Sequence, residues 1–246
     1  MYFAVLTLFP DLIRSVAGTS ITGRAISAGL LAVDAIDIRD FAGNAYGKVD
    51  DSPYGGGRGM LMMCPPVHAA WKSACERCGV PRPHTVFLSP QGKTFDQKRA
   101  SELAALPAVV LLCGHYEGID QRVLDEIVDE EISLGDFVLT GGEIPALAVI
   151  DAVSRLIPGV LPDERAYLDE SHSDGTLEHP HYTRPVEWEG KKVPDVLLSG
   201  HHANIVQWRR KMSLATTLRK RPDLFGRLRL EKGEGVGLAE FLSQMD

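Results

Sequence analysis

The sequence has 246 residues, of which 44% are hydrophobic and 24% are charged, and its net charge is −7. These values are ordinary for a globular protein and exclude collagen-like, low-complexity and intrinsically disordered chains. The length is sufficient for one large domain or two modest ones, with a sizeable core.

Five short apolar runs, bounded by glycine or proline, alternate with longer helical patterns along the first part of the chain. The run at 108–113 is apolar throughout, which is typical of a strand buried on both faces of a parallel sheet. The sequence therefore predicts an α/β fold with helices on both faces of the sheet. The predicted strands are residues 2–9, 31–38, 84–88, 108–113 and 132–139.

The N-terminal strand lacks the basic region and the cleavage site of a signal peptide. The longest apolar stretch, around 105–113, is much shorter than the roughly 20 residues that span a bilayer. Four cysteines in a chain of this size do not form a disulfide framework, which favours a reducing compartment. These features predict a cytoplasmic protein with no membrane partner.

Cys75 and Cys78 form a C-E-R-C motif, which could be half of a zinc site or a redox pair. No second cysteine pair and no suitably spaced histidine pair accompany it. Two thiols one turn apart on a helix are the favoured interpretation.

Apolar residues recur at helical spacing over 143–156, and this predicted amphipathic helix lies between Gly141-Gly142 and Pro158-Gly159. The following residues, 160–185, are polar and without periodicity, as in a linker or mobile segment. After Gly200 the pattern becomes helical and basic. The members of the apolar face are Ile144, Leu147, Ile150, Val153 and Leu156.

The charge is divided unevenly along the chain. Residues 201–229 contain eight Lys and Arg against the single acid Asp223, a local balance of +7 that leaves −14 for the remainder. A basic module on an acidic body is expected when one part contacts a polyanion such as a nucleic acid. A solvated helix face is the alternative.

Three glycine-containing segments, 88–92, 113–120 and 133–142, come at the ends of predicted strands. In an α/β sheet, ligands bind beyond the carboxyl ends of the strands, and glycines let the backbone approach a planar ligand. The segments therefore predict a nucleotide-like ligand, with tight β–α connections as the alternative. A P-loop at 18–23 is excluded because Arg24-Ala25 follows it, and the glycines at 55–59 lack the dinucleotide-binding register.

Longer strings of residues make the sequence similar to the bacterial tRNA (guanine-N1)-methyltransferase family of TrmD type, a branch of the SPOUT methyltransferases. They occur in family order along most of the chain. The strings are residues 50–63, 88–92, 113–120, 133–145, 151–155, 158–161, 179–185 and 198–202.

The resemblance implies methyl transfer from S-adenosylmethionine to N1 of guanine 37 in tRNA, immediately 3′ of the anticodon, with guanine preferred as its 5′ neighbour. It also implies a homodimer, a deep trefoil knot and a small helical C-terminal domain. The implied organisation is a methyltransferase domain at 1–160, a linker carrying the catalytic acid at 161–185, and a basic tRNA-binding domain at 186–246.

The family's cofactor pocket can be carried over residue by residue onto the three strand-end segments. The implied cofactor-binding residues are Leu88, Ser89, Pro90, Gln91, Gly114, Tyr116, Glu117, Gly118, Leu134, Gly135, Asp136, Phe137, Val138, Leu139, Gly141, Gly142 and Pro145.

Methylation at guanine N1 requires a base to remove the N1 proton and a cation to stabilise the charge growing on O6. The resemblance implies Arg155 as the O6 donor. The family's base is an Asp followed by Ser, and its position here is occupied by Glu170, so the sequence departs from the pattern. The neighbouring Asp169 is the alternative base, and a third possibility is that neither residue acts.

The implied nucleic-acid partner is tRNA and not DNA. Asp50 and Gly59 would contact the target guanine and its neighbour, while the basic helix would contact phosphates, which position the substrate without reading its sequence. The helix residues assigned to this contact are Trp208, Arg209, Arg210, Lys211, Arg219 and Arg221.

His115 occupies a position where relatives often carry Arg, so a charge there would depend on pH; an ordinary loop side chain is the alternative. The other histidines of the C-terminal half, at 179, 181, 201 and 202, lack metal-site spacing as a set, and capping or hydrogen bonding is expected of them. No structural metal is predicted. The resemblance permits a Mg²⁺ requirement, which the sequence itself does not show.

A non-catalytic RNA-binding factor that kept the fold is the second functional hypothesis. Its only motive is the Glu-for-Asp departure at Glu170, and the intact cofactor loops together with Arg155 argue against it.

Overall fold

The computed structural model describes residues 1–163, 167, 170–230, 234 and 238. The chain divides into two compact units, Met1–Glu164 and Arg165–Asp246. The elements of the first unit are β1 Tyr2–Thr7, α1 Pro10–Ala17, α2 Ser20–Ser27, β2 Ala32–Asp37, the 3-10 helix η1 Ile38–Phe41, β3 Asp50–Asp51, β4 Leu61–Met62, α3 Cys64–Cys78, β5 His84–Thr94, α4 Gln97–Ala104, β6 Ala108–Cys113, α5 Gln121–Ile127, β7 Glu130–Ser133 and α6 Glu143–Ser154.

The first unit is built on a five-stranded sheet in the order β2-β1-β6-β5-β7. Every pair of neighbouring strands is parallel. All six residues of β6, the central strand, are buried, as expected for an apolar run covered on both faces. The predicted parallel α/β architecture is confirmed.

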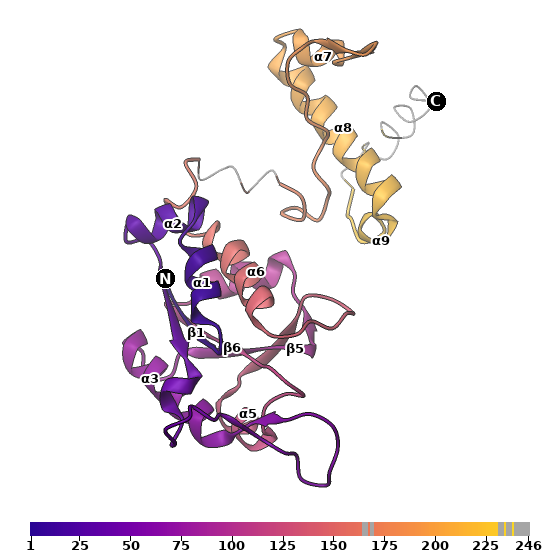
Figure 1. Ribbon diagram of the computed structural model, residues 1–246. Helices are drawn as coiled ribbons and strands as arrows, with labels where there is room; N and C mark the ends of the chain where they lie inside the picture. Colours follow the sequence, from indigo (N-terminus) through magenta and orange to yellow (C-terminus); the bar gives the residue numbers. More distant parts are fainter. Residues whose placement is uncertain (164–166, 168–169, 231–233, 235–237, 239–246) are drawn as a thin grey trace. The chain divides into compact units, whose positions relative to one another are not determined.

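Helices cover both faces of this sheet. Successive side chains of a strand point to opposite faces, so each strand contributes residues to both cores. On β1, Phe3 and Val5 join one core cluster with residues of α1, α2, α4 and α6. Ala4 and Leu6 join the other cluster, with residues of α3 and α5. Figure 1 shows the two helical layers on either side of the strands.

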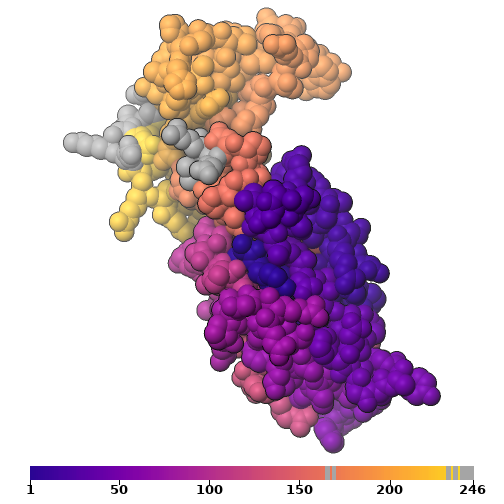
Figure 2. Space-filling view, turned by 90° about the vertical axis from the view of Figure 1, so that its left-hand side faces the viewer, coloured from indigo at the N-terminus to yellow at the C-terminus, as the bar shows by residue number. Residues whose placement is uncertain are grey.

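Segments that are distant in sequence lie side by side in this unit. The backbone N–H of Tyr2 donates to the carbonyl of Pro107 at 3.0 Å, just before β6 begins. Figure 2 shows the indigo N-terminal residues against purple and magenta residues from the middle of the chain. The first strand of the chain therefore lies inside the sheet, between β2 and β6.

The fifth predicted strand, at 132–139, is wrong over residues 134–139, because β7 spans Glu130–Ser133. Gly135 has a φ of 152° and the chain turns there, with the N–H of Phe137 donating to the carbonyl of Gly135 at 2.9 Å. Phe137 and Val138 are 55% and 82% exposed, so the apolar run belongs to a loop and not to the sheet.

Helix α6 begins at Glu143 and ends at Ser154, close to the predicted bounds. Four of the five residues predicted for its apolar face pack on the core: Ile150 and Val153 are buried, and Leu147 and Leu156 are partly buried against the same cluster. Ile144 is the exception, at 57% exposed.

The elements described in the second unit include a short antiparallel hairpin and helices α7, α8 and α9, and the long basic helix α8 agrees with the prediction for this region. Residues Leu214 and Ala215 of α8 pack with Phe225 and Leu228. No described residue between α6 and β8 belongs to a helix or strand. The elements are β8 Glu187–Trp188, β9 Lys191–Lys192, α7 Asp195–Leu198, α8 His202–Lys220 and α9 Pro222–Phe225.

Across the described parts of both units, the helices are too short or too polar to cross a membrane.

Cys75 and Cys78 lie one turn apart near the end of α3, and all four cysteines are free. Burial raises the pKa of both thiols, that of Cys78 to about 11. Cys113 is wholly buried, and its burial together with the Glu143 carboxylate raises its pKa well above the usual range. Since reactive thiols have a lowered pKa, these directions favour the interpretation of the motif as two structural thiols.

We expect iodoacetamide at about pH 8 to label Cys75 and Cys78 of the native protein at least tenfold more slowly than free cysteine, because the thiolate is the reacting form. Cys113 should remain unlabelled until the protein unfolds. Peptide mass spectrometry after timed quenching measures this, and the protein unfolded in guanidinium is the control. Rapid native labelling of the pair would indicate an activated redox motif instead.

Candidate active site

The three glycine-containing segments meet at the carboxyl ends of β5, β6 and β7. In β5 the register shifts between Leu88 and Lys93, so that residues 89–92 bulge out of the sheet beside β7. The segment that follows β7 returns to β6, where the N–H of Gly142 donates to the carbonyl of Gly114 at 3.0 Å. Because β6 and β7 lie on opposite sides of β5, this return crosses the end of β5.

These segments enclose a cavity of about 250 Å³. Most of the predicted cofactor residues line it, and their role in cofactor binding stays a prediction. Gln91, Gly135 and Asp136 do not line it. The predicted residues that do are Leu88, Ser89, Pro90, Gly114, Tyr116, Glu117, Gly118, Leu134, Phe137, Val138, Leu139, Gly141, Gly142 and Pro145.

Five further residues line the cavity that were not among the predicted ones. Phe87, Ile132 and Ser133 are late residues of β5 and β7, and their position beside the segments at 88–92 and 133–142 could have identified them. His115 and Thr140 belong to the loops themselves. His115, for which an ordinary loop side chain was the alternative, lines the cavity.

Glycine is required where the third segment touches β6. A β-carbon on Gly142 would lie 2.6 Å from the Cα of Cys113, and one on Gly141 would lie 2.3 Å from the His115 ring. Backbone atoms cannot retreat from such contacts as the end of a flexible side chain can. The two glycines therefore let the third segment lie directly on the second, which brings the walls of the cavity together.

A buried carboxylate supports this wall from behind. Glu143, the first residue of α6, is 4% exposed. The Thr7 hydroxyl donates to its Oε1 at 2.6 Å, and its Oε2 lies 2.7 Å from His115 Nε2. Phe9 stacks at a tilt on the same ring, with centroids 4.9 Å apart. The carboxylate thus ties β1, the second segment and the start of α6 to one another.

The predicted target-binding loop lies beside the second segment. Asp50 in β3 pairs with Met62 in β4, and the loop between these strands contains Gly59. The N–H of Glu117 donates to the carbonyl of Met60 at 3.0 Å, and the N–H of Met62 donates to Gly118 at 2.9 Å. The glycine-rich loop is therefore hydrogen-bonded directly to the rim of the cavity.

Among the predicted catalytic residues, Arg155 belongs to the same unit as this cavity and does not line it. Arg155 is the C-cap of α6, at the opposite end of the helix from Gly142. A helix of 12 residues is about 18 Å long. Glu170 is half-buried in the second unit, where its carbonyl accepts a hydrogen bond from Ser173 at 3.2 Å. Asp169 lies outside the described residues.

The predicted tRNA-binding side chains of the C-terminal helices differ in their exposure and in their ion pairs. Arg210 forms ion pairs with Asp174 and Glu234, both at 2.8 Å, and Arg221 pairs with Asp223 at 2.6 Å. Trp208 is half-buried, and its ring lies 6.2 Å from that of His179. Lys211 is also half-buried. The exposed members are Arg209, Arg219 and Arg221.

Comparison with known proteins decides the family. The sequence model of the family described as tRNA (guanine-1)-methyltransferase TrmD matches residues 1–227. The chain belongs to this family. The match extends from β1 through α9 and so includes residues of both units.

Individual TrmD-family relatives agree with this assignment. A Ruminiclostridium cellulolyticum protein named tRNA (guanine-N(1)-)-methyltransferase is 56% identical over 228 residues, which are 93% of this chain and 97% of the relative. Proteins of the same name from Lachnospira eligens and Burkholderia mallei are 53% and 52% identical. They cover 92% and 94% of this chain and 95% and 88% of their own lengths. The chain is therefore similar to methyltransferase enzymes over nearly its whole length.

We expect Glu143→Ala to lower the free energy of unfolding by about 1–3 kcal/mol, because it leaves the buried Thr7 hydroxyl and the His115 ring without their shared acceptor. Thermal denaturation followed by circular dichroism measures the loss. Glu76→Ala, an exposed glutamate on α3, is the matched control and should leave the melting temperature unchanged. Equal stability of Glu143→Ala and the wild type would contradict the anchoring role.

Proposed function

We propose that this TrmD-family enzyme transfers a methyl group from S-adenosylmethionine to N1 of guanine 37 in tRNA, with guanine preferred as the 5′ neighbour. The observation that carries the proposal is the cavity at the carboxyl ends of β5, β6 and β7, lined by the backbone of three glycine-containing segments. The proposal includes the SPOUT-type trefoil knot of the resemblance and a cytoplasmic location.

The residues around the cavity suit S-adenosylmethionine. Leu88, Leu134 and Leu139 offer an apolar slot for a planar base, while glycine backbone offers N–H and C=O groups to its edge. The Glu117 carboxylate lies on the rim and complements the positive charge of a sulfonium ion. When bound, the cofactor supplies an electrophilic methyl group.

The protein must prepare the guanine for this transfer. In the proposal Glu170 accepts the proton of guanine N1, with Asp169 as the alternative base, and Arg155 donates hydrogen bonds to O6 as negative charge grows there. Removal of the N1 proton frees a lone pair on the nitrogen, which can then attack the methyl group. Exclusion of water by the walls of the cavity strengthens both interactions.

A homodimer is part of the proposal, because Arg155 does not line the cavity of its own unit. Arg155 lies about 18 Å along α6 from the end of the helix at Gly142. Two copies related by symmetry can supply complementary parts of one site, as in other isologous dimers. We therefore assign the cofactor segments to one protomer and the acid and the basic helix to its partner.

Recognition of tRNA is assigned to two surfaces. The target base has to leave its stack to reach the cavity, and the proposal assigns contact with that base and its neighbour to the loop containing Gly59, which is hydrogen-bonded to the rim of the cavity. The exposed arginines of α8, Arg209 and Arg219, are assigned to backbone phosphates. The proposal keeps the Mg²⁺ requirement that the resemblance permits and assigns no step to it.

The test of the proposal is methyl transfer from labelled S-adenosylmethionine to two unmodified tRNA transcripts. One carries guanine at position 36 before guanine 37, and the other carries adenine at position 36. Transfer to the first alone, mapped to N1 by nuclease digestion and mass spectrometry, is the expected result. Cofactor binding without transfer to either would favour the non-catalytic RNA-binding hypothesis.

We expect Arg155→Ala and Glu170→Gln each to lower turnover by about 10²- to 10⁴-fold, because they remove the O6 donor and the base. Affinity for S-adenosylmethionine should be nearly unchanged, since the proposal assigns both residues to the guanine and not to the cofactor. Single-turnover methylation and calorimetric titration separate the two effects.

Two further variants identify the base. Glu170→Asp keeps a carboxylate and should retain most of the activity, whereas Asp169→Asn should have little effect. If Asp169→Asn is inactive and Glu170→Gln is active, the base is Asp169 instead. A loss of cofactor affinity in Arg155→Ala or Glu170→Gln would contradict both assigned roles.

We expect Arg209→Ala and Arg219→Ala each to weaken tRNA binding several-fold and to reduce the slope of log affinity against log salt by about 0.7 to 0.9. Filter binding at several salt concentrations measures the slope. Lys98→Ala, which removes an exposed charge from α4, is the matched control. A slope equal to that of the wild type would show that these arginines do not contact phosphate.

A further inference from the structure

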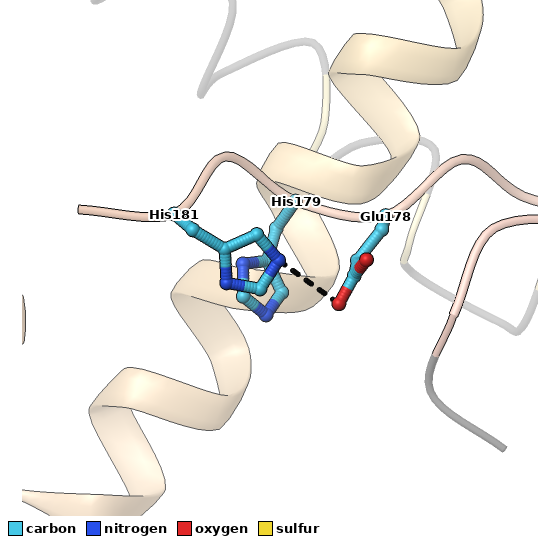
Figure 3. Close-up of side chains that lie close together, drawn as sticks. All are labelled: Glu178, His179 and His181. Atoms are coloured by element: carbon cyan, nitrogen blue, oxygen red, sulfur yellow. Dashed lines mark ion pairs between the residues drawn. The ribbon is translucent and has the colours of Figure 1, made fainter. Parts of the chain in front are cut away.

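Three metal-ligating side chains come together in the second unit, at residues 178–181. Glu178, His179 and His181 each offer one ligand atom, and these atoms all lie within 4.8 Å of one another. Glu178 Oε1 is 2.9 Å from His181 Nε2, and the two histidine rings lie 4.5 Å apart. Figure 3 shows the three side chains gathered in front of α8, with the ion pair as a dashed line.

The donor set is that of a borderline divalent metal ion. Two imidazoles and one carboxylate suit Zn²⁺ and its first-row neighbours, whereas Mg²⁺ and Ca²⁺ prefer oxygen ligands. Around Zn²⁺ with ligand distances near 2.0–2.1 Å, neighbouring ligand atoms are about 3.3 Å apart. The Glu178–His181 distance is already close to this value, and His181 is exposed and free to adjust its rotamer.

The surroundings of the cluster also suit a metal. The Nδ1 of His179 lies 3.2 Å from the carbonyl of Pro180, so that Nδ1–H can donate there. Metal-binding histidines commonly make such a contact, which leaves the other ring nitrogen with its lone pair. The three side chains line a hollow of about 440 Å³, large enough to admit water ligands.

Positive charge near the cluster is partly neutralised. Arg209 and Arg210 line the same hollow, and Arg210 is held by Asp174 and by Glu234, each at 2.8 Å. Arg209 is exposed and can extend its guanidinium into solvent. A divalent cation at the cluster therefore meets carboxylates as well as guanidinium groups.

We propose that Glu178, His179 and His181 bind one divalent transition-metal ion of the zinc class. The ion would replace the proton shared by Glu178 and His181 and fix residues 178–182 against α8, where the rings of His179 and Tyr182 lie 6.2 and 6.3 Å from that of Trp208. Among the described residues the buried core of this unit is small, and small cores often depend on a metal for stability.

The sequence analysis excluded this site because the histidines have no metal spacing as a set. The carboxylate that completes the cluster, Glu178, was not considered there. The site is independent of the proposed methyl transfer, and its test requires no activity measurement.

The experiment is titration of the full-length metal-free protein with Zn²⁺ in competition with a chromogenic zinc indicator. A C-x-x-C pair is a possible competing zinc ligand, so the measurement is made on Cys75→Ser/Cys78→Ser. We expect one Zn²⁺ per chain, with affinity at least tenfold lower after Glu178→Gln or His181→Ala. His201→Ala/His202→Ala, which removes two exposed histidines outside the cluster, should bind as tightly as its parent.

A second readout uses Co²⁺, whose visible absorption reports imidazole and carboxylate ligands at the bound metal. Far-UV circular dichroism of each variant shows whether α8 is retained. The proposal is overturned if Cys75→Ser/Cys78→Ser binds no stoichiometric Zn²⁺, or if folded His181→Ala in the same background binds Zn²⁺ as tightly as its parent.

Discussion

The contact on which the active-site architecture depends is the approach of the Gly142 backbone to β6. The N–H of Gly142 donates to the carbonyl of Gly114 at 3.0 Å, and there is no room for a β-carbon between Gly142 and Cys113. This contact returns the chain from β7 across the end of β5 and starts α6 at a defined point. The cavity, the position of Glu143 and the distance from the cavity to Arg155 all follow from it.

Glu143 converts this backbone contact into a rigid junction. A buried carboxylate is unfavourable unless its oxygens are hydrogen-bonded, and here Thr7 and His115 serve one oxygen each. Because Thr7 belongs to β1 and His115 to the second segment, the sheet and the wall of the cavity share one acceptor. A cofactor that contacts this wall would meet a surface that is already organised, which reduces the entropic cost of binding.

The sequence predicted much of the fold because periodicity and glycine positions encode it locally. The run at 108–113 could only be a buried strand, and it is β6. Residues 134–139 were assigned to a strand because apolar composition does not reveal that Gly135 turns the chain away. In α6 the helical spacing correctly placed Ile150 and Val153 in the core, but it also included Ile144, which is exposed.

Prediction of the functional residues had the same limit. Lining residues could be carried over as strings, but His115 acquires its place through Glu143, which lies 28 residues later in the chain. Arg210 was predicted from charge alone, and its ion pairs with Asp174 and Glu234 are long-range contacts that no local pattern shows. The cluster of Glu178, His179 and His181 likewise required side-chain positions. What composition cannot encode is which polar groups meet across the fold.

The central claim is that the three converging segments hold S-adenosylmethionine. Amide hydrogen exchange of the full-length protein, with and without the cofactor, tests it most directly. The account predicts that added S-adenosylmethionine slows exchange in residues 88–92, 114–118 and 134–142, while the exposed helix face of α3 is unaffected. Saturating cofactor that leaves these three segments unchanged, or that protects a different region instead, would contradict the account.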